Sequence, residues 1–336
     1  MKLVQKYKII FYFLLSFLIL NACNRQNSIK NKNVDLKVIR FDKELSQLDE
    51  LHYNQQLDEL LKKYPLLMEV YVEQIARAGA VSDTLFKNRL KPVIFDNYTQ
   101  KLYEKVETTF PDFEPLKKEI NEALNYIVSY FPDIELPEVY TIVSNFGLST
   151  ATYENILLIS LDMYLGSNYQ YYEGLFPKYK YNYFTTEQLV PDVARVWFSY
   201  MFPEDSFAGK TLLSKMIYFG KMNLFLEKMI PGISDTILLQ YTNEQIKFAD
   251  KYRKELWQSI VESKMLFNSD MLKTGRYIEE APFTNAYNIP QQCPPRIGRY
   301  FGWQIVKNYH RKNPDINLAD LMNEKDENLI LRGYKP

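Results

Sequence analysis

The chain has 336 residues, of which 46% are hydrophobic, and its 41 acidic and 41 basic side chains give a formal net charge of zero. A chain of this length and composition buries a substantial core, so a disordered or low-complexity protein is excluded. It carries no basic excess of the kind that nucleic-acid-binding proteins use, and we therefore expect no nucleic acid among its partners.

The N-terminus has the three-part pattern of a secretory signal peptide. Three lysines precede a mostly apolar run at 9–20, which is too short to span a bilayer as a helix. The run ends in Leu20-Asn21-Ala22-Cys23, the pattern of a lipobox. We predict a signal peptide at 1–22, cleavage before Cys23, and thioether attachment of lipid to the Cys23 thiol. Several acyl chains, palmitate among them, would then anchor the protein in a membrane. The alternative is an uncleaved anchor with an incidental cysteine.

The segment that follows the lipobox is polar, rich in asparagine and nearly free of apolar residues. Such a composition cannot bury a core, so we predict a flexible tether at 23–34. The remaining residues, 35–336, are predicted to form a single globular domain. Once Cys23 carries lipid, Cys293 has no partner for a disulfide within the chain.

The first hundred residues of this domain are predicted to be mainly helical. The clearest element is 112–131, in which apolar residues recur at spacings of three and four between Pro111 and Pro132. The middle differs, because 139–146 and 156–161 are rich in β-branched residues and predict two strands. An irregular, aromatic stretch follows at 169–183.

Helices are predicted again in the last third. Two capping-box patterns, beginning at Thr185 and Thr242, predict the starts of a helix to about Phe202 and of one long helix through Ile260. Further helices are predicted at 211–229, 296–310 and 318–322, with a proline-rich loop at 273–295. Gly298 and Gly302, four residues apart, predict close contact between helices. The fold class predicted is α+β, mostly helical, with a small β-sheet in the middle and helices on both sides.

Several motifs, in their order along the chain, resemble those of GldB, a family of gliding-motility lipoproteins of the Bacteroidetes. The motifs are the lipobox, Leu161-Asp162-Met163-Tyr164-Leu165-Gly166, Leu213 to Lys221, Pro294-Pro295-Arg296-Ile297-Gly298-Arg299-Tyr300-Phe301-Gly302-Trp303-Gln304-Ile305-Val306, and Tyr334 to Pro336. The resemblance covers essentially the whole chain. It implies a lipid-anchored component of the cell envelope that serves gliding and the associated type IX secretion machinery, with other envelope proteins of that machinery as partners.

That family is distantly similar to predicted zinc peptidases. This second resemblance implies a zincin-like scaffold. In such peptidases a His-Glu-x-x-His helix binds Zn²⁺ and a later helix carries a carboxylate ligand. The matching helix here, 187–202, has no histidine, because none lies between His52 and His310. Phe219 stands where the later carboxylate would be. We therefore expect no zinc, no other cofactor and no peptidase activity, and interpret the chain as a degenerate, pseudo-peptidase form of that scaffold.

Three residues are candidate relics of the ancestral cleft: Asp192, Arg195 and Phe219. Asp192 and Arg195 lie three residues apart on one predicted helix, and an intrahelical ion pair is the simpler interpretation. The cleft itself is predicted between the strand edge at 156–161 and the helix 187–202. Lys215 and Lys221 are interpreted as solvated helix surface.

The aromatic stretch is the best candidate for contact with a partner, since aromatic residues dominate contact energies at interfaces. A loop folded over the core of the domain explains the same residues equally well. The interaction candidates are Tyr169, Tyr171, Tyr172, Tyr179 and Tyr181. No catalytic residue is predicted. The function predicted is a non-enzymatic envelope component that acts through protein contacts and faces the periplasm; the alternatives are a hydrolase or a peptide-binding protein that uses the cleft.

Overall fold

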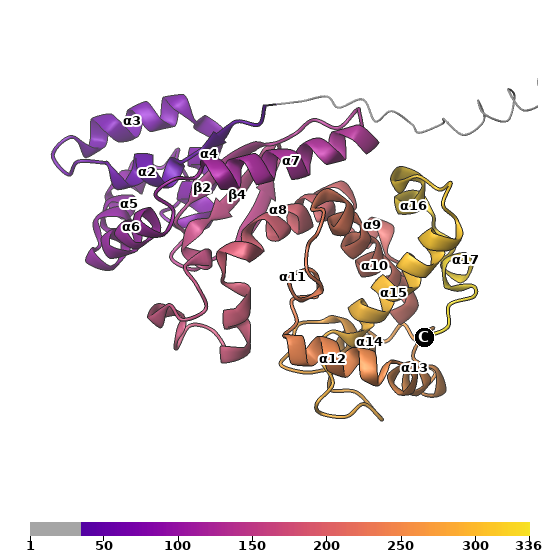
Figure 1. Ribbon diagram of the computed structural model, residues 1–336. Helices are drawn as coiled ribbons and strands as arrows, with labels where there is room; N and C mark the ends of the chain where they lie inside the picture. The colour runs from indigo at the N-terminus through magenta and orange to yellow at the C-terminus, as the bar shows by residue number, and fades with distance from the viewer. Residues whose placement is uncertain (1–34) are drawn as a thin grey trace, which may run out of the picture.

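The computed structural model of the protein describes residues 35–336. The predicted signal peptide, Cys23 and the tether lie outside these residues. Figure 1 shows a small β-sheet packed with helices at one end of the molecule and a group of helices at the other, with α8 between them. The predicted class, α+β and mostly helical, is confirmed.

Most of the N-terminal part is helical, as predicted from its apolar periodicity. Its helices are α2 (Phe41–Ser46), α3 (Tyr53–Lys63), α4 (Pro65–Val70), the π-helical turn η1 (Tyr71–Ile75), α5 (Phe86–Phe95), α6 (Asn97–Thr109) and α7 (Glu114–Tyr130). Apolar residues on one face of α7 are buried, among them Ile120, Leu124 and Ile127. That face explains why 112–131 gave the clearest helical pattern.

The sheet has four strands in the order β1-β2-β4-β3. They are β1 (Val38–Ile39), β2 (Glu138–Ile142), β3 (Thr150–Tyr153) and β4 (Ile156–Ser160). β2 is parallel to β1 and to β4, whereas β3 is antiparallel to β4. The prediction that 156–161 forms the edge of the sheet is wrong: β4 lies inside the sheet, every one of its residues is buried, and β3 forms the edge.

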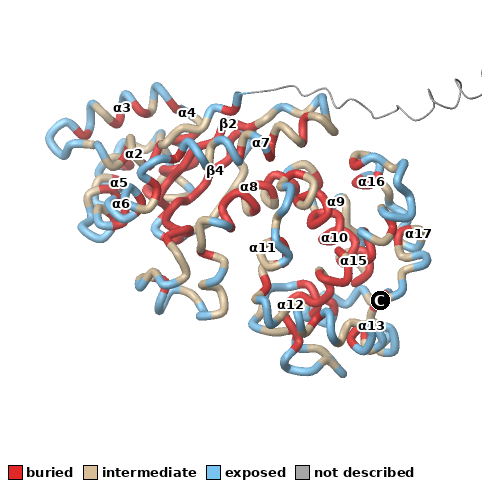
Figure 2. The backbone as a smooth tube through the Cα atoms, viewed as in Figure 1, coloured by how far each residue is buried: buried red, intermediate tan, exposed pale blue. Residues whose placement is uncertain are grey.

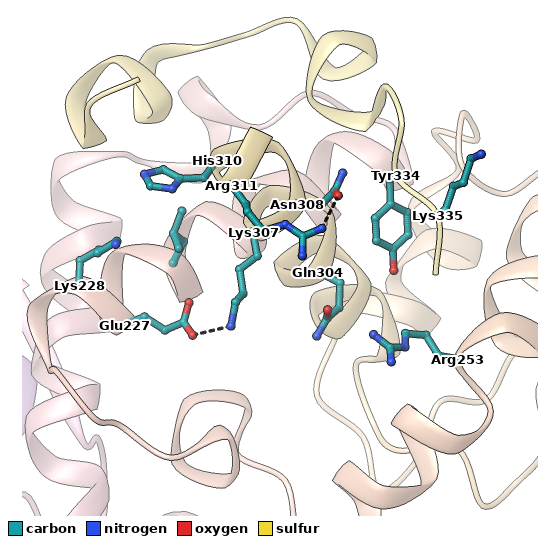
Figure 3. Close-up of a pocket in the computed structure, with 11 residues that line it drawn as sticks. Glu227, Lys228, Arg253, Gln304, Lys307, Asn308, His310, Arg311, Tyr334 and Lys335 are labelled. Atoms are coloured by element: carbon teal, nitrogen blue, oxygen red, sulfur yellow. Dashed lines mark hydrogen bonds and ion pairs between the residues drawn. The ribbon is translucent and has the colours of Figure 1, made fainter. Parts of the chain in front are cut away.

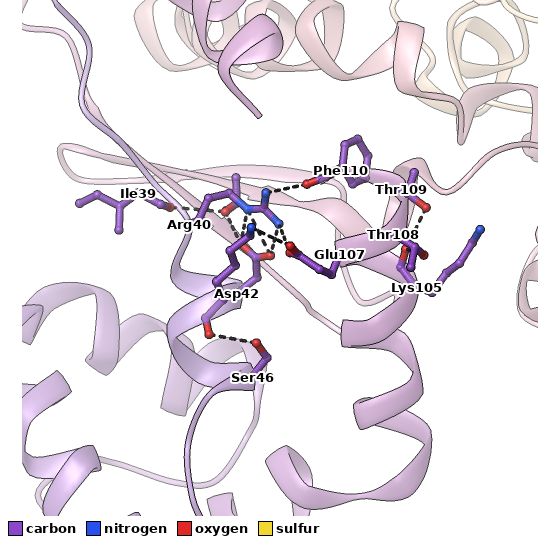
Figure 4. Close-up of polar contacts among 11 residues, drawn as sticks. Ile39, Arg40, Asp42, Ser46, Lys105, Glu107, Thr108, Thr109 and Phe110 are labelled. Atoms are coloured by element: carbon purple, nitrogen blue, oxygen red, sulfur yellow. Dashed lines mark hydrogen bonds and ion pairs between the residues drawn. The ribbon is translucent and has the colours of Figure 1, made fainter. Parts of the chain in front are cut away.

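A buried ion pair joins the start of the domain to the sheet. The Arg40 guanidinium binds the Asp42 carboxylate at 2.7 Å and donates to the Phe110 carbonyl at 3.0 Å, while the Thr141 hydroxyl of β2 donates to Asp42 (Figure 4). Asp42 is only 2% exposed. These contacts supply the partners that a buried carboxylate requires. They also hold α2 against β2 and the end of α6.

The rest of the chain is helical apart from the aromatic stretch. Its elements are the 3-10 turns η2 (Leu161–Tyr164), η3 (Gln170–Tyr172) and η4 (Lys178–Tyr183), then α8 (Thr186–Met201), α9 (Glu204–Phe207), α10 (Leu212–Met229), α11 (Asp235–Leu239), α12 (Asn243–Lys251), α13 (Arg253–Glu262), α14 (Met271–Ile278), α15 (Ile297–Lys312), α16 (Leu318–Asn323) and α17 (Glu327–Leu331).

Three local predictions in this part are wrong. The capping box at Thr185 does not form, because the Gln188 side chain accepts instead from Arg195. The long helix from Thr242 breaks at Tyr252 into α12 and α13, although its capping box is present. The predicted loop 273–295 contains most of α14.

Two long helices, α10 and α15, cross at van der Waals contact through glycines. A Cβ atom on Gly302 would overlap the backbone carbonyl of Met216, and one on Gly220 would overlap the backbone of Gly302. Figure 2 shows both helices buried along most of their length. The predicted close contact at Gly302 is therefore confirmed, and it forms the centre of the C-terminal helices.

Candidate functional site

A cleft of about 310 Å³ opens beside α8 and the loop that leads into the edge strand β3. We use "the cleft" for the cavity lined by Phe146, Gly147, Leu148, Ser149, Met163, Tyr164, Phe176, Lys180, Tyr183, Phe184, Asp192, Gln240 and Glu280. Its walls come from six parts of the chain: the β2–β3 loop, η2, the aromatic stretch, α8, the end of α11 and the segment after α14. This cavity adjoins α8 and the start of β3, whereas the predicted cleft lay between α8 and a strand edge at 156–161.

Asp192 is the charged residue of α8 that lines the cleft. Its carboxylate accepts from Arg195 at 2.6 Å, from the Tyr164 hydroxyl at 3.0 Å and from the Gln240 amide at 3.4 Å. Burial raises the pKa of Asp192, and the Arg195 guanidinium opposes that shift. The predicted intrahelical ion pair is confirmed.

Arg195 points away from the cleft toward the end of α11. It donates to the carbonyls of Ile237 at 2.7 Å and Leu238 at 3.0 Å. Carbonyls in the last turn of a helix lack partners within the helix, so the guanidinium satisfies them and fixes α11 on α8. Arg195 is therefore a structural clamp behind Asp192.

Two residues that the sequence analysis did not assign to the cleft complete its polar network. Gln240 has a left-handed backbone (φ 54°) at the end of α11 and joins Asp192 to Arg296. Arg296 is only 5% exposed. Its guanidinium donates to the Gln240 side chain at 2.9 Å and to the Tyr183 hydroxyl at 3.3 Å. No local motif marks these residues as partners, because they are joined only by the fold.

Phe219 does not line the cleft. It lies on α10 with its ring under the Arg299 guanidinium, at 3.8 Å from the ring centroid. Burial lowers the pKa of Arg299 to about 9. The structure therefore brings Asp192 and Arg195 together and leaves the third predicted relic in a separate cation–π contact.

The aromatic stretch packs on itself and on the core. Tyr172 is fully buried; its hydroxyl donates to the Asp162 carbonyl at 2.8 Å and accepts from the Leu165 amide at 3.1 Å. It is therefore a core residue and offers no surface to a partner, contrary to its place among the interaction candidates. Tyr169, Tyr171 and Tyr181 are half-buried against the core, and Tyr179 is half-buried too.

The interpretation of Lys221 as solvated surface is wrong. Lys221 is 7% exposed, and its ammonium donates to the Met322 carbonyl at 3.2 Å and to the Glu324 carbonyl, at the end of α16. Burial lowers its pKa to about 8. Lys215 is also largely covered, with a side chain 17% exposed and an ion pair to Glu204 at 3.3 Å. Both lysines therefore hold helices together.

Neither a metal-ligand cluster nor a membrane-spanning helix is found in residues 35–336. Nowhere in this range do three His, Cys, Asp or Glu side chains gather so that they could hold a metal ion. Within the same range, each helix is too short or too polar to cross a bilayer.

The fold and the cleft define an α+β protein whose mixed sheet is joined through one central helix to a group of helices packed around α10 and α15. The family model described as gliding motility protein GldB matches residues 22–336, nearly the whole chain. The chain belongs to this family of gliding-motility lipoproteins. No curated protein and no solved structure matches it.

Proposed function

We propose that this protein is a lipid-anchored, non-enzymatic component of the gliding apparatus and its type IX secretion machinery. Membership of the GldB family implies the role in gliding and a place in the cell envelope. The finer proposal is that Cys23 holds the chain at a membrane on the periplasmic side, and that the domain acts by contact with other envelope proteins.

The cleft supports a binding role better than a catalytic one. α8 packs beside an antiparallel edge strand, β3, an arrangement consistent with a zincin-like scaffold. The observation that carries the proposal is the state of Asp192: Arg195, Tyr164 and Gln240 occupy its carboxylate oxygens. A carboxylate engaged in this way holds the walls of the cleft together and is poorly placed to activate water.

A conservative substitution at Asp192 distinguishes a protein that acts through contacts from an enzyme that needs this carboxylate. Asp192→Asn keeps the size of the side chain and its contact with Tyr164 but loses the charge. We expect a loss of stability of about 1–3 kcal/mol from the weakened bond to Arg195. We also expect gliding to persist at a temperature at which the variant stays folded. Colony spreading in a strain that lacks the wild-type chain measures this; immobile cells with normal levels of folded variant would indicate an essential carboxylate.

Filling the cleft tests the contact itself. Ser149→Trp places a large ring in the cleft and leaves Asp192 and Arg195 unchanged. We expect loss of gliding and of in-cell crosslinks to other envelope proteins in a variant that stays folded, although its melting temperature falls because the hydrogen bond between Ser149 and Tyr164 is lost. The matched control is Ser206→Trp on α9, an exposed position outside the cleft. Normal gliding and crosslinking in the folded Ser149→Trp variant would contradict a role for the cleft.

The anchor gives a separate prediction. Cys23→Ala removes the only thiol that the lipobox offers for thioether formation. We expect the variant to lose metabolic labelling with fatty acid and to accumulate as an unprocessed or soluble protein. Fractionation with labelled palmitate measures both effects. Membrane retention with an undiminished lipid label would show that the anchor lies elsewhere.

A further inference from the structure

A second cavity, of about 510 Å³, lies in the C-terminal helices, away from the cleft. We call it the α15 pocket; Figure 3 shows its lining. Gln304, Lys307, Asn308 and Arg311 form the floor, and their spacing of three, four and seven places them on one face of α15. The walls are the end of α10, with Glu227 and Lys228, and the opposite side formed by Arg253, Tyr334 and Lys335.

The charges of the α15 pocket are strongly unbalanced. Five cationic side chains and one carboxylate line it: Lys228, Arg253, Lys307, Arg311 and Lys335 against Glu227. Glu227 is paired with Lys307 at 2.9 Å. The other four cations make no ion pair within residues 35–336. The pocket therefore holds a local positive field in a chain whose net charge is zero.

Helix dipoles explain some of these cations better than others. Lys228 and Arg311 lie in the last turns of α10 and α15, where a positive charge is favourable. Arg253 is the first residue of α13 and also lies two residues beyond the end of α12, so the dipoles of these two helices act on its charge in opposite directions. The helix ends therefore leave the charge of Arg253 unexplained, and Arg253 presents that charge to the pocket.

The pocket also contains buried hydrogen-bonding groups without partners. The Asn308 amide nitrogen and the Tyr334 hydroxyl are both buried, and neither has a hydrogen-bond partner in the part of the chain that the structure describes. Buried polar atoms are normally satisfied, so each such atom needs an explanation. Both groups can donate, as can the guanidinium and ammonium groups around them.

We propose that the α15 pocket binds a multiply charged phosphate group, such as a phosphomonoester or diphosphate. The Arg and Lys donors around one cavity match a group with several acceptor oxygens and a charge of about −2. The Asn308 amide and the Tyr334 hydroxyl are buried, so these two side chains must turn toward the cavity before they donate to such a group. The planar fork of Arg253 suits bidentate binding of such oxygens. Two sources carry this chemistry, a lipid headgroup in the membrane that holds the protein and a soluble phosphate compound.

The test uses the mature chain, residues 23–336, carrying Cys23→Ala so that no lipid attaches. Binding of inorganic pyrophosphate is measured by calorimetry, and binding to vesicles by co-sedimentation, with phosphatidic acid in phosphatidylcholine against phosphatidylcholine alone. We expect Arg253→Gln to weaken binding by at least about tenfold. The matched control, Arg276→Gln on the exposed side of α14, removes the same charge outside the pocket and should change binding by less than about twofold.

The two histidines provide a direct readout of the occupied site. His310 lines the pocket, where burial and Lys228 lower its pKa, whereas His52 is exposed in the N-terminal part. A bound phosphate stabilises the protonated imidazole, so the ligand should raise the pKa of His310, followed by NMR, and leave His52 unchanged.

Each outcome decides the proposal. Pyrophosphate binding that Arg253→Gln weakens supports a phosphate site open to soluble ligands. Pocket-dependent binding to phosphatidic acid vesicles without pyrophosphate binding supports a headgroup site. Three results would overturn the proposal. They are equal losses of binding in Arg253→Gln and Arg276→Gln, a pKa of His310 that the ligand does not change, and no binding to either pyrophosphate or vesicles. Because the cleft is untouched, failure here leaves the proposed function unaffected.

Discussion

Gly302→Ala is expected to lower the free energy of unfolding by about 3 kcal/mol, the upper end of the usual range for overpacking. The added methyl group would overlap the backbone carbonyl of Met216 on α10, and a backbone carbonyl cannot move aside as a side chain can. Relief requires α10 and α15 to separate, which opens the surrounding core. Urea unfolding followed by circular dichroism measures the change.

Gly275→Ala is the matched control for this prediction. Gly275 lies within α14, and its Cβ would meet only the flexible Glu279 side chain at 3.3 Å. Alanine in a helix interior is favoured over glycine, so this variant should be neutral or more stable by about 0.5–1 kcal/mol. A Gly302→Ala variant as stable as the wild type would show that the two helices do not cross at this distance.

Asp162→Asn is expected to be the next most damaging change, with a loss of about 2–3 kcal/mol in the free energy of unfolding. The Asp162 carboxylate is fully buried and accepts from the backbone amides of Ser144 at 3.2 Å and Phe146 at 2.6 Å, and from the Ser160 hydroxyl. It thereby holds the β2–β3 loop, in which Asn145 and Phe146 have positive φ angles. Asparagine replaces one acceptor with a donor, and a backbone amide is left without a partner.

The pH dependence of stability provides a second measurement at Asp162. Burial raises the pKa of this carboxyl above its ordinary value, so the folded state binds a proton at a pH where the unfolded state has lost it. Its contribution to stability therefore falls as pH rises from the ordinary value through the raised one. The difference in the free energy of unfolding between the wild type and Asp162→Asn should therefore become smaller as pH rises across that window.

The control at an exposed site is Asp112→Asn. Asp112 also accepts from a backbone amide, that of Glu114 at 2.9 Å, but in contact with water. We expect a change within about 0.5 kcal/mol in the free energy of unfolding, as for most surface substitutions. Similar losses of stability at both positions would mean that the burial of Asp162 does not increase its contribution to stability.

The sequence predicted the parts whose signals are local. Apolar residues at helical spacing identified α7, and β-branched runs identified β2 and β4. The order of motifs identified the GldB family, which the family model confirms. The predicted lipidation of Cys23, the domain boundaries and a partner contact through Tyr169, Tyr171, Tyr179 and Tyr181 stay predictions, whereas Tyr172 is buried in the core.

Short elements escaped prediction because their neighbours hold them. β1 has two residues and β3 has four, so neither carries an alternating pattern long enough to recognise. Hydrogen bonds to β2 and β4 make them strands. Likewise, the predicted capping box at Thr185 does not form. The Gln188 side chain makes tertiary contacts instead, and its amide donates to the Ile237 carbonyl, 49 positions away in the sequence.

The sequence by itself determined the family, the helical character, and the absence of histidine from α8, which removes the usual zinc ligands. Only the tertiary structure decided which polar groups meet. Gln240 contacts Asp192 across 48 positions and Arg296 across 56, and Arg253 shares a pocket with α15. Local spacing cannot encode such contacts, because packing of the helices brings these side chains together.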